Sequence, residues 1–96
     1  MMNPAKVDRS KLHKLTDLPN IGPASAADLI LLSIHSPEAL IGRDPFALFT
    51  ELCTITKQIH DPCVIDVFIS IVRFMEGDAP KPWWHYTQER KQTLKQ

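Results

Sequence analysis

Apolar side chains recur three and four positions apart along most of the chain, and this spacing is typical of amphipathic helices. In four places a proline follows a residue that suits the start of a helix. Proline is favoured in the first helical turn because the N–H that it lacks would have no partner there. The pattern predicts five helices, over residues 9–17, 23–33, 37–42, 45–57 and 62–76, and the starting pairs are Gly22–Pro23, Ser36–Pro37, Asp44–Pro45 and Asp61–Pro62.

The stretch 62–76 is apolar almost all round, so we expect it to lie at the centre of a helical bundle. Its β-branched residues also suit a buried strand. A cap at Asp61 and a stop at Gly77 enclose a segment that is long for a strand, so its length favours a helix. We therefore predict an all-α fold, a compact bundle of about five helices.

Composition fits one domain covering residues 1–96, with its core at about residues 10–88. The 96 residues are 44% hydrophobic, which is enough for a single core. The longest apolar segment, residues 63–75, is shorter than the roughly 18–20 residues that a membrane span needs, so we expect no membrane partner. Residues 1–11 hold no apolar run of the kind found in secretion signals, and two cysteines fit a reducing compartment. The expected location is the cytoplasm.

Charge is distributed unevenly along a chain whose formal net charge is zero. Residues 1–14 carry four basic side chains against one acidic, and residues 81–96 carry the same excess, while residues 15–80 carry nine acidic against three basic. A net charge of zero argues against coating nucleic acid by bulk electrostatics. We expect the basic ends to be solvated and flexible, unless they fold against the rest of the chain and make one part of it positive.

The segment before Pro23 predicts a tight connection between two helices. An apolar stripe ends at Leu18, and Pro19 interrupts it. Asn20 and Gly22 then predict a turn with positive φ, which is cheap for glycine and tolerable for asparagine. Pro23 opens the next helix, so the amide groups around the turn face the positive end of a helix dipole.

A weak internal sequence repeat suggests a second, similar helix-connection-helix unit. Residues 15–21 align with residues 49–55 at an offset of 34, and Pro23 aligns with Pro62 at an offset of 39. The second connection is five residues longer and lacks the glycine. We therefore expect the second connection to serve packing.

Residues 18–26 resemble the helix-hairpin-helix motif of DNA repair and recombination proteins, and residues 12–90 resemble a small bacterial family called pathogenicity locus, some members of which carry the name mitomycin resistance protein. The resemblance rests on four segments, which are Leu18-Pro19-Asn20-Ile21-Gly22-Pro23-Ala24, Ile41-Gly42-Arg43-Asp44-Pro45, His60-Asp61-Pro62-Cys63 and Pro82-Trp83-Trp84-His85-Tyr86. It implies a helix-hairpin-helix, SAM-like fold with one intact and one degenerate hairpin. It implies no particular reaction.

The same resemblance implies contact between the first hairpin and the DNA phosphate backbone, without reading of bases. Two departures from the motif matter: Asn20 stands where a glycine is usual, and Ala24 stands where a basic residue is usual. Because a phosphate partner is missing, we expect weak, sequence-nonspecific binding. The candidate DNA-binding residues are Pro19, Asn20, Ile21, Gly22, Ala24 and Ser25.

Other interpretations stay open. The hairpin can serve only to join two packed helices, and the chain can be a protein-interaction module or a homodimer that uses Trp83 and Trp84. These tryptophans also suit a clamp folded over the central helix. The sequence contains no spacing of nucleophile, base and acid and no phosphate-binding glycine loop, so we expect no enzyme and no cofactor.

Cys53 and Cys63 flank the second connection and suggest a less favoured function, a thiol redox sensor. Cys63 falls in the first turn of a helix, where the dipole lowers the pKa of a thiol. With His60 the cysteines also hold potential metal ligands, but the spacing matches no short Cys-x-x-Cys clamp, and we expect no metal. Two structural thiols are the simplest alternative.

Overall fold

The structure is a computed structural model in which residues 2–94 are described. Four α-helices account for most of the regular structure, and the described residues contain no strand. The all-α prediction is therefore confirmed. None of the described helices is long and apolar enough to cross a membrane. The helices are α1 (Pro23–Leu31), α2 (Pro45–Thr56), α3 (Cys63–Met75) and α4 (Thr87–Leu94).

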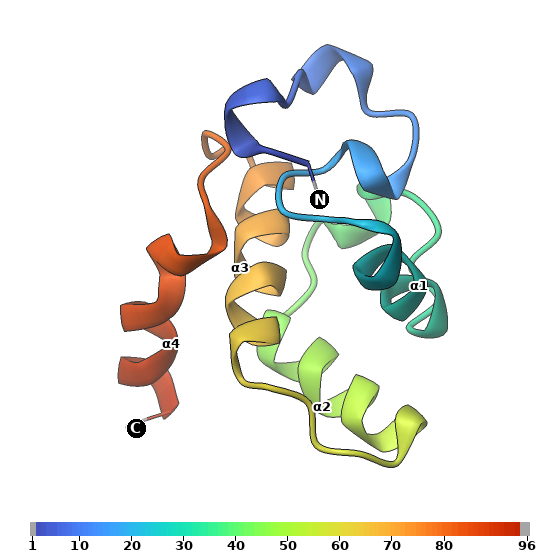
Figure 1. The fold of residues 1–96 in the computed structure, drawn as a ribbon, viewed down its shortest axis with the longest axis vertical. Helices are drawn as coiled ribbons and strands as arrows, with labels where there is room; N and C mark the ends of the chain where they lie inside the picture. Colours follow the sequence, from blue (N-terminus) through green and yellow to red (C-terminus); the bar gives the residue numbers. More distant parts are fainter. Residues whose placement is uncertain (1, 95–96) are drawn as a thin grey trace.

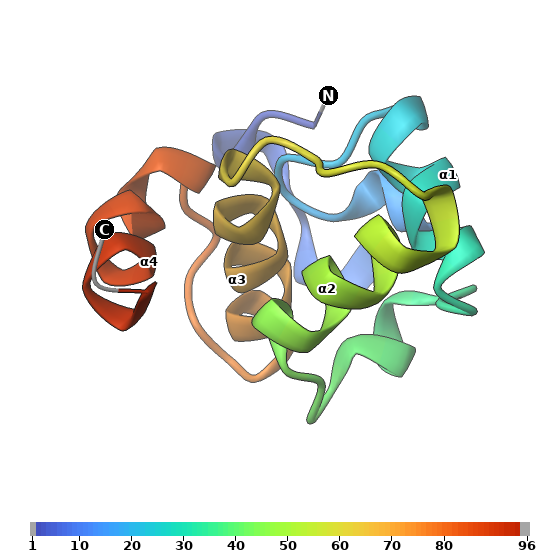
Figure 2. The same ribbon diagram turned by 90° about the horizontal axis from the view of Figure 1, so that it is seen from below.

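Helix α3 stands at the centre of the molecule, with α4 on one flank and α1 and α2 on the other (Figures 1 and 2). The prediction of a central helix is confirmed, and the alternative of a buried strand is wrong. Gly77 adopts φ +115° just after the helix, and the N–H of Asp78 donates to the carbonyl of Arg73 at 3.0 Å. This left-handed residue ends the helix where the sequence predicts the stop.

Asp44 caps α2 as predicted, whereas α3 begins one residue later than predicted, with Pro62 as its N-cap and Asp61 just before it. Asp44 Oδ1 accepts the N–H of Phe46 at 2.9 Å, and Asp61 Oδ1 accepts the N–H of Cys63 at 2.8 Å. Each carboxylate satisfies an amide that has no partner inside its own helix.

The predicted helices over residues 9–17 and 37–42 are short 3₁₀ turns instead. The first region holds two turns, Arg9–Lys11 and Leu15–Asp17, and the second holds one, Pro37–Leu40. Between the first two turns, Asp17 Oδ2 accepts the N–H of His13 at 2.9 Å and that of Lys14 at 3.0 Å. A side chain that binds these amides competes with helical hydrogen bonds, so the helix does not form through this segment.

Residues beyond position 88, the expected end of the core, also fold. A 3₁₀ turn at Trp83–Tyr86 leads directly into α4. The helix is polar all round and is held by ion pairs: Arg90 Nε donates to Asp66 Oδ1 at 2.8 Å in a buried contact, and Arg73 pairs with Glu89 at the surface. In the aromatic segment, Tyr86 packs into the core and Trp83 is half-buried, whereas Trp84 is 63% exposed.

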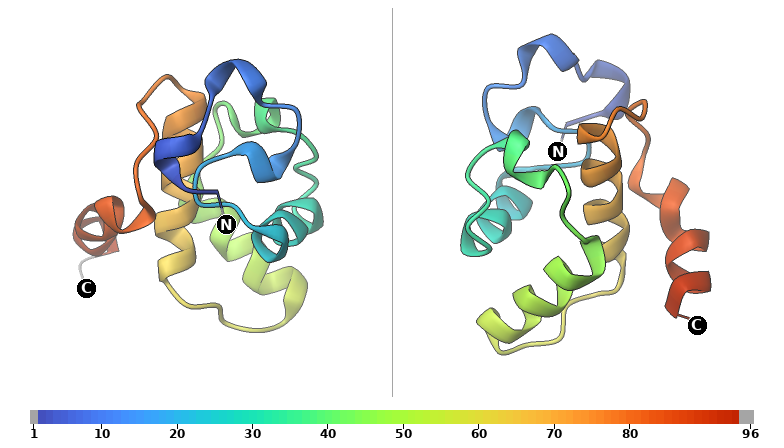
Figure 3. Two further views of the ribbon diagram at one scale, coloured as in Figure 1. Left: turned by 45° about the horizontal axis from the view of Figure 1, so that its top comes forward. Right: turned by 180° about the vertical axis from the view of Figure 1, so that it is seen from behind.

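The N-terminal segment crosses one end of the bundle and lies beside the loop that precedes α1 (Figure 3). It begins with a 3₁₀ turn at Pro4–Lys6. Arg9 fixes it there, because Nη1 donates to the Phe74 carbonyl at 2.6 Å, Nη2 donates to the Asp78 carbonyl at 2.7 Å, and the guanidinium lies 4.0 Å from the centre of the Phe74 ring. The basic N-terminal residues are thus brought to the hairpin, while α4 lies on the opposite flank of α3 (Figure 1).

Candidate functional site

The turn between residues 18 and 22 is held by burial of its side chains. Leu18 and Ile21 have no exposed surface, and Pro19 is also buried. These side chains face the core, so the turn offers only its backbone to a ligand.

Asn20 shapes this turn. Its φ is +66°, as the sequence predicts, and its side-chain amide donates to Ser70 Oγ at 3.0 Å and to the Lys81 carbonyl at 2.8 Å. Its own N–H donates to the carbonyl of Met2 at 3.0 Å. Asn20 is buried, and its backbone and side-chain N–H groups are bound within the protein. The residue therefore holds the hairpin in position from the side of the core.

Gly22 does not adopt the predicted positive φ. Its φ of −99° and ψ of −176° are extended values that any residue can adopt, and they are typical of the residue before a helix. Asn20 alone supplies the left-handed residue of this turn, so Gly22 has no conformational need to be glycine. What Gly22 contributes is the absence of a side chain at the N-cap of α1.

The start of α1 consequently presents unsatisfied amides. The N–H of Ala26 donates to the Gly22 carbonyl at 2.9 Å, and no side chain caps the helix. Within residues 2–94, the N–H groups of Ile21, Gly22, Ala24 and Ser25 have no acceptor in the protein. Ala24 is exposed and Ser25 is half-buried, so this end of the dipole can be reached from solvent.

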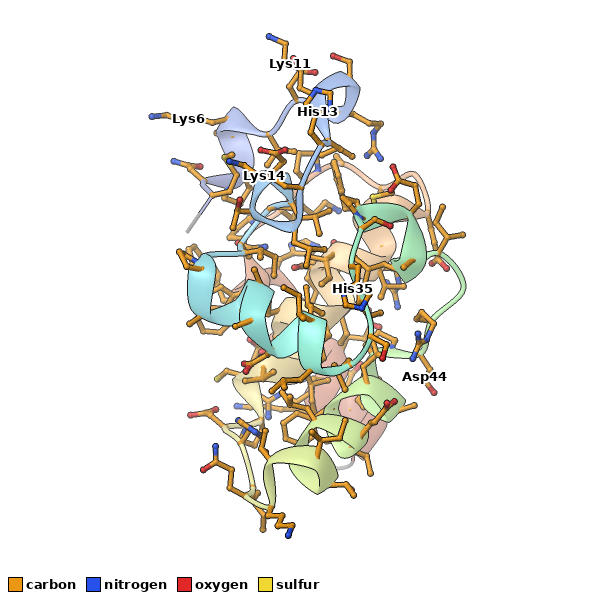
Figure 4. The ribbon with its side chains drawn as sticks, turned by 90° about the vertical axis from the view of Figure 1, so that its right-hand side faces the viewer. Lys6, Lys11, His13, Lys14, His35 and Asp44 are labelled. Carbon is orange, nitrogen blue, oxygen red and sulfur yellow. The ribbon has the colours of Figure 1, made fainter. Side chains whose placement is uncertain are left out.

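A groove of about 410 Å³ runs past the start of α1. Lys6 forms part of its wall, and its side chain extends outward from the N-terminal segment (Figure 4). The excess of basic residues over positions 1–14 predicts positive charge in the N-terminal segment. The sequence does not show that Lys6 is the residue that lines the groove. The groove is lined by Met2, Asn3, Lys6, Thr16, Ile21, Gly22 and Pro23.

Two carboxylates lie near this cationic side. The N–H of His13 holds the pKa of Asp17 below its usual value, and the Ser10 hydroxyl does the same for the pKa of Asp8. Both groups are therefore ionised at neutral pH and offset part of the positive charge. Lys11 approaches Asp8 only to 4.0 Å in an exposed pair, which contributes little to stability.

The two cysteines proposed as redox residues lie at the two ends of the connection between α2 and α3. Cys53 and Cys63 are free, partly buried thiols. A hydrogen bond to the Asp61 carboxylate raises the pKa of Cys63, so the expectation that the helix dipole lowers this pKa is wrong. The His60 ring contacts Thr56 Oγ1 at 2.7 Å, and no group of three or more metal-binding side chains occurs among residues 2–94.

The connection between α2 and α3 leaves one large apolar side chain in solvent. Lys57 ends α2 with a left-handed φ of +55°. Ile59 is then 93% exposed, although isoleucine is among the residues most often buried. The tip of this loop projects away from the core.

Comparison with known proteins places the chain in a family. A model of the family described as Pathogenicity locus (Cdd1) matches residues 8–92. The chain is also 39% identical over 80 residues to mitomycin resistance protein McrB of Streptomyces lavendulae, an alignment that covers 83% of this chain and 76% of that protein. No solved structure matches it. Since the family model covers most of the sequence, the chain belongs to the Pathogenicity locus family.

Proposed function

We propose that this chain is a noncatalytic helix-hairpin-helix module that binds DNA weakly through its phosphate backbone. In this proposal the first unit comprises the 3₁₀ turn Leu15–Asp17, the turn around Asn20 and α1, and the second comprises α2 and α3. The first hairpin binds a phosphate. The second is degenerate and has lost the glycine.

One observation carries the proposal, the group of unpartnered amides at the exposed start of α1. A helix N-terminus attracts anions because its amides and its dipole point the same way. Lys6, on the wall of the groove, adds a mobile cation to this fixed site. Contacts of this kind recognise phosphate oxygens and carry no base information, so binding would be independent of sequence.

Weak affinity follows from the charges around the hairpin. Ala24 supplies no cation, and the ionised Asp17 lies close by. Each missing phosphate contact lowers affinity and makes its dependence on salt shallower. The name of the Streptomyces relative refers to mitomycin resistance. We propose that this chain acts in a similar context, as a module that contacts DNA.

Fluorescence anisotropy with a labelled duplex at low and moderate salt tests the proposal. We expect Gly22→Asp to weaken binding at least about tenfold, because the new carboxylate both caps the amides and repels phosphate. The fold should be preserved, since the backbone at Gly22 is extended and Asp is a favoured N-cap. Ala47→Asp, which adds the same charge at the exposed first turn of α2, is the matched control.

Two results would overturn the proposal. One is the absence of salt-sensitive binding below about 100 µM at low ionic strength, because nonspecific duplex binders usually reach micromolar affinity. The other is an equal loss in Gly22→Asp and Ala47→Asp, which would reflect net charge alone.

A second candidate function, docking of a protein or of another copy of this chain, is favoured by the exposure of Ile59 and Trp84. Aromatic residues such as tryptophan are enriched at protein interfaces. Sedimentation of the full chain over a wide concentration range tests self-association. If it occurs, Ile59→Asp or Trp84→Ser should return the chain to a monomer, and a monomer at every concentration rules out the homodimer.

A further inference from the structure

A second hollow adjoins the groove at the start of α1. It has a volume of about 270 Å³, and Thr16 lines both hollows. Three apolar residues and four polar ones surround it, and none of them is acidic. The lining residues are Leu15, Ala26 and Ile30, with His13, Lys14, Thr16 and His35.

The 13–16 side of this hollow is fixed by two anchors. The Asp17 carboxylate accepts the backbone N–H groups of His13 and Lys14, and Leu15 is buried in the core. The Asp17 bonds use only backbone groups. The exposed side chains of His13 and Lys14 therefore stay available at the rim of the hollow.

The opposite side comes from the chain that leaves α1. Ser33 takes a left-handed φ of +63°, and the N–H of Ile34 returns to the Leu29 carbonyl at 2.9 Å. Ile34 is completely buried, which leaves His35 exposed at the edge. His13, Lys14 and His35 consequently lie on the same face of the molecule, the face that α1 occupies (Figure 4).

These groups favour a phosphate ester. An ammonium group, two imidazoles and a hydroxyl are all donors to anionic oxygens, while Ala26 and Ile30 offer an apolar wall for a sugar or base. The volume lies just below the range of about 300–1,000 Å³ typical of pockets for drug-sized ligands. The hollow is therefore large enough for little more than one nucleotide.

We propose that the hollow around Lys14 and His35 is a second phosphate subsite, which takes the nucleotide next to the one held at the start of α1. The shared wall at Thr16 places the two subsites side by side. That the nucleotide comes from a DNA strand rests on the proposed function. A free nucleotide carries the same phosphate ester, and the experiment separates the two sources.

Anisotropy with a labelled duplex over a salt series tests the first source. Lys14→Gln should weaken binding about 3- to 10-fold and reduce the slope of log affinity against log salt concentration by about 1, as expected for one lost phosphate contact. His35→Gln should weaken binding as well. Lys57→Gln removes the same charge from the exposed end of α2 and should leave affinity within about twofold.

Titration of the ¹⁵N-labelled protein with thymidine 5′-monophosphate tests the second source. We expect shifts of the amide signals of Lys14, Thr16 and His35. If duplex binding fails but these shifts occur, the subsite stands with a free nucleotide as its ligand, and the DNA proposal falls. If Gly22→Asp abolishes duplex binding while Lys14→Gln and Lys57→Gln behave alike, the subsite is overturned and the hairpin proposal survives. Absence of both duplex binding and shifts overturns both.

Discussion

The side-chain nitrogen of Asn20 donates to Ser70 Oγ at 3.0 Å and so joins the turn before α1 to the middle of α3. The same nitrogen donates to the Lys81 carbonyl at 2.8 Å. A glycine could adopt the same left-handed backbone, but it would supply neither hydrogen bond. Asparagine meets both demands at this position, which gives a physical reason for the departure from the usual glycine.

Replacement of left-handed residues by glycine should therefore have opposite effects at different sites. Asn20→Gly should destabilise the protein by about 1–3 kcal/mol, because it removes the donor of the buried Ser70 hydroxyl and of the part-buried Lys81 carbonyl. Ser33→Gly and Lys57→Gly should stabilise it by up to about 1 kcal/mol. Both residues are exposed and follow the end of a helix, so the substitution relieves the strain of a left-handed backbone and removes no buried contact. Urea unfolding measures all three.

Asn20→Ala serves as the control, since it removes the same hydrogen bonds and keeps the strain of a left-handed residue. It should cost about 1–2 kcal/mol more than Asn20→Gly. If Asn20→Gly proved as stable as the parent chain, the amide bonds to Ser70 and Lys81 would not hold the hairpin.

The buried pair of Asp66 and Arg90 should dominate the attachment of α4. Asp66 has no exposed surface and also accepts the hydroxyl of Thr87 at 2.7 Å. Arg90→Ala should cost about 3–5 kcal/mol, because it leaves a buried carboxylate without its cation. Urea unfolding gives the loss, and the far-UV circular dichroism spectrum reports whether α4 is still helical.

The half-exposed pair of Arg73 and Glu89 provides the comparison. Glu89→Gln should cost no more than about 1 kcal/mol, since water screens a pair of this exposure. Equal losses in Arg90→Ala and Glu89→Gln would show that burial of the Asp66 pair is unimportant.

The contrast between these helices shows what local sequence can reveal. The starts of α2 and α3 are predictable because Asp44 and Asp61 act on amides two positions away. Helix α4 lacks an apolar stripe, and Arg90 is held by a carboxylate 24 positions earlier. Periodicity carries no signal for such an attachment, so the helix could not be inferred from its own residues.

The candidate site divides in the same way. The turn before α1 is predictable from Asn20 and Pro23, which act locally, whereas the positive φ predicted at Gly22 is wrong. The roles of the individual residues in this site are not predictable from the sequence. The burial of Asn20 depends on its contact with Ser70, and the position of Lys6 depends on how the N-terminal segment crosses the bundle. Long-range contacts thus bury the side chain of Asn20 and place Lys6 on the wall of the groove.

Cys63 should react slowly with thiol reagents. Its hydrogen bond to Asp61 raises its pKa, so less thiolate is present near neutral pH than in an ordinary cysteine. Asp61→Asn removes the charge and should increase the rate of alkylation by iodoacetamide at pH 7.5, which mass spectrometry follows. Cys53, alkylated in the same samples, is the internal control, and an unchanged rate at Cys63 would show that Asp61 does not govern the thiol.

The Asp17 carboxylate should make stability depend on pH at the acidic end. The N–H of His13 lowers the pKa of Asp17 in the folded protein, so the ionised carboxylate adds stability above the unfolded value of about 3.9. This contribution is lost as the pH falls through the lower folded pKa. Asp17→Asn should therefore be less stable than the parent chain at pH 7, and the gap should narrow as the pH falls below the unfolded pKa of about 3.9.

Urea midpoints of the two proteins at pH 7, 5 and 3 give the comparison. The parent chain should lose more stability than Asp17→Asn between pH 5 and pH 3, because only the parent takes up a proton at this position on unfolding. The amide signals of His13 and Lys14 should shift over the same pH range, since their N–H groups bind the titrating oxygen. A gap that stays constant with pH would mean that the charge of Asp17 does not hold the rim formed by these two residues.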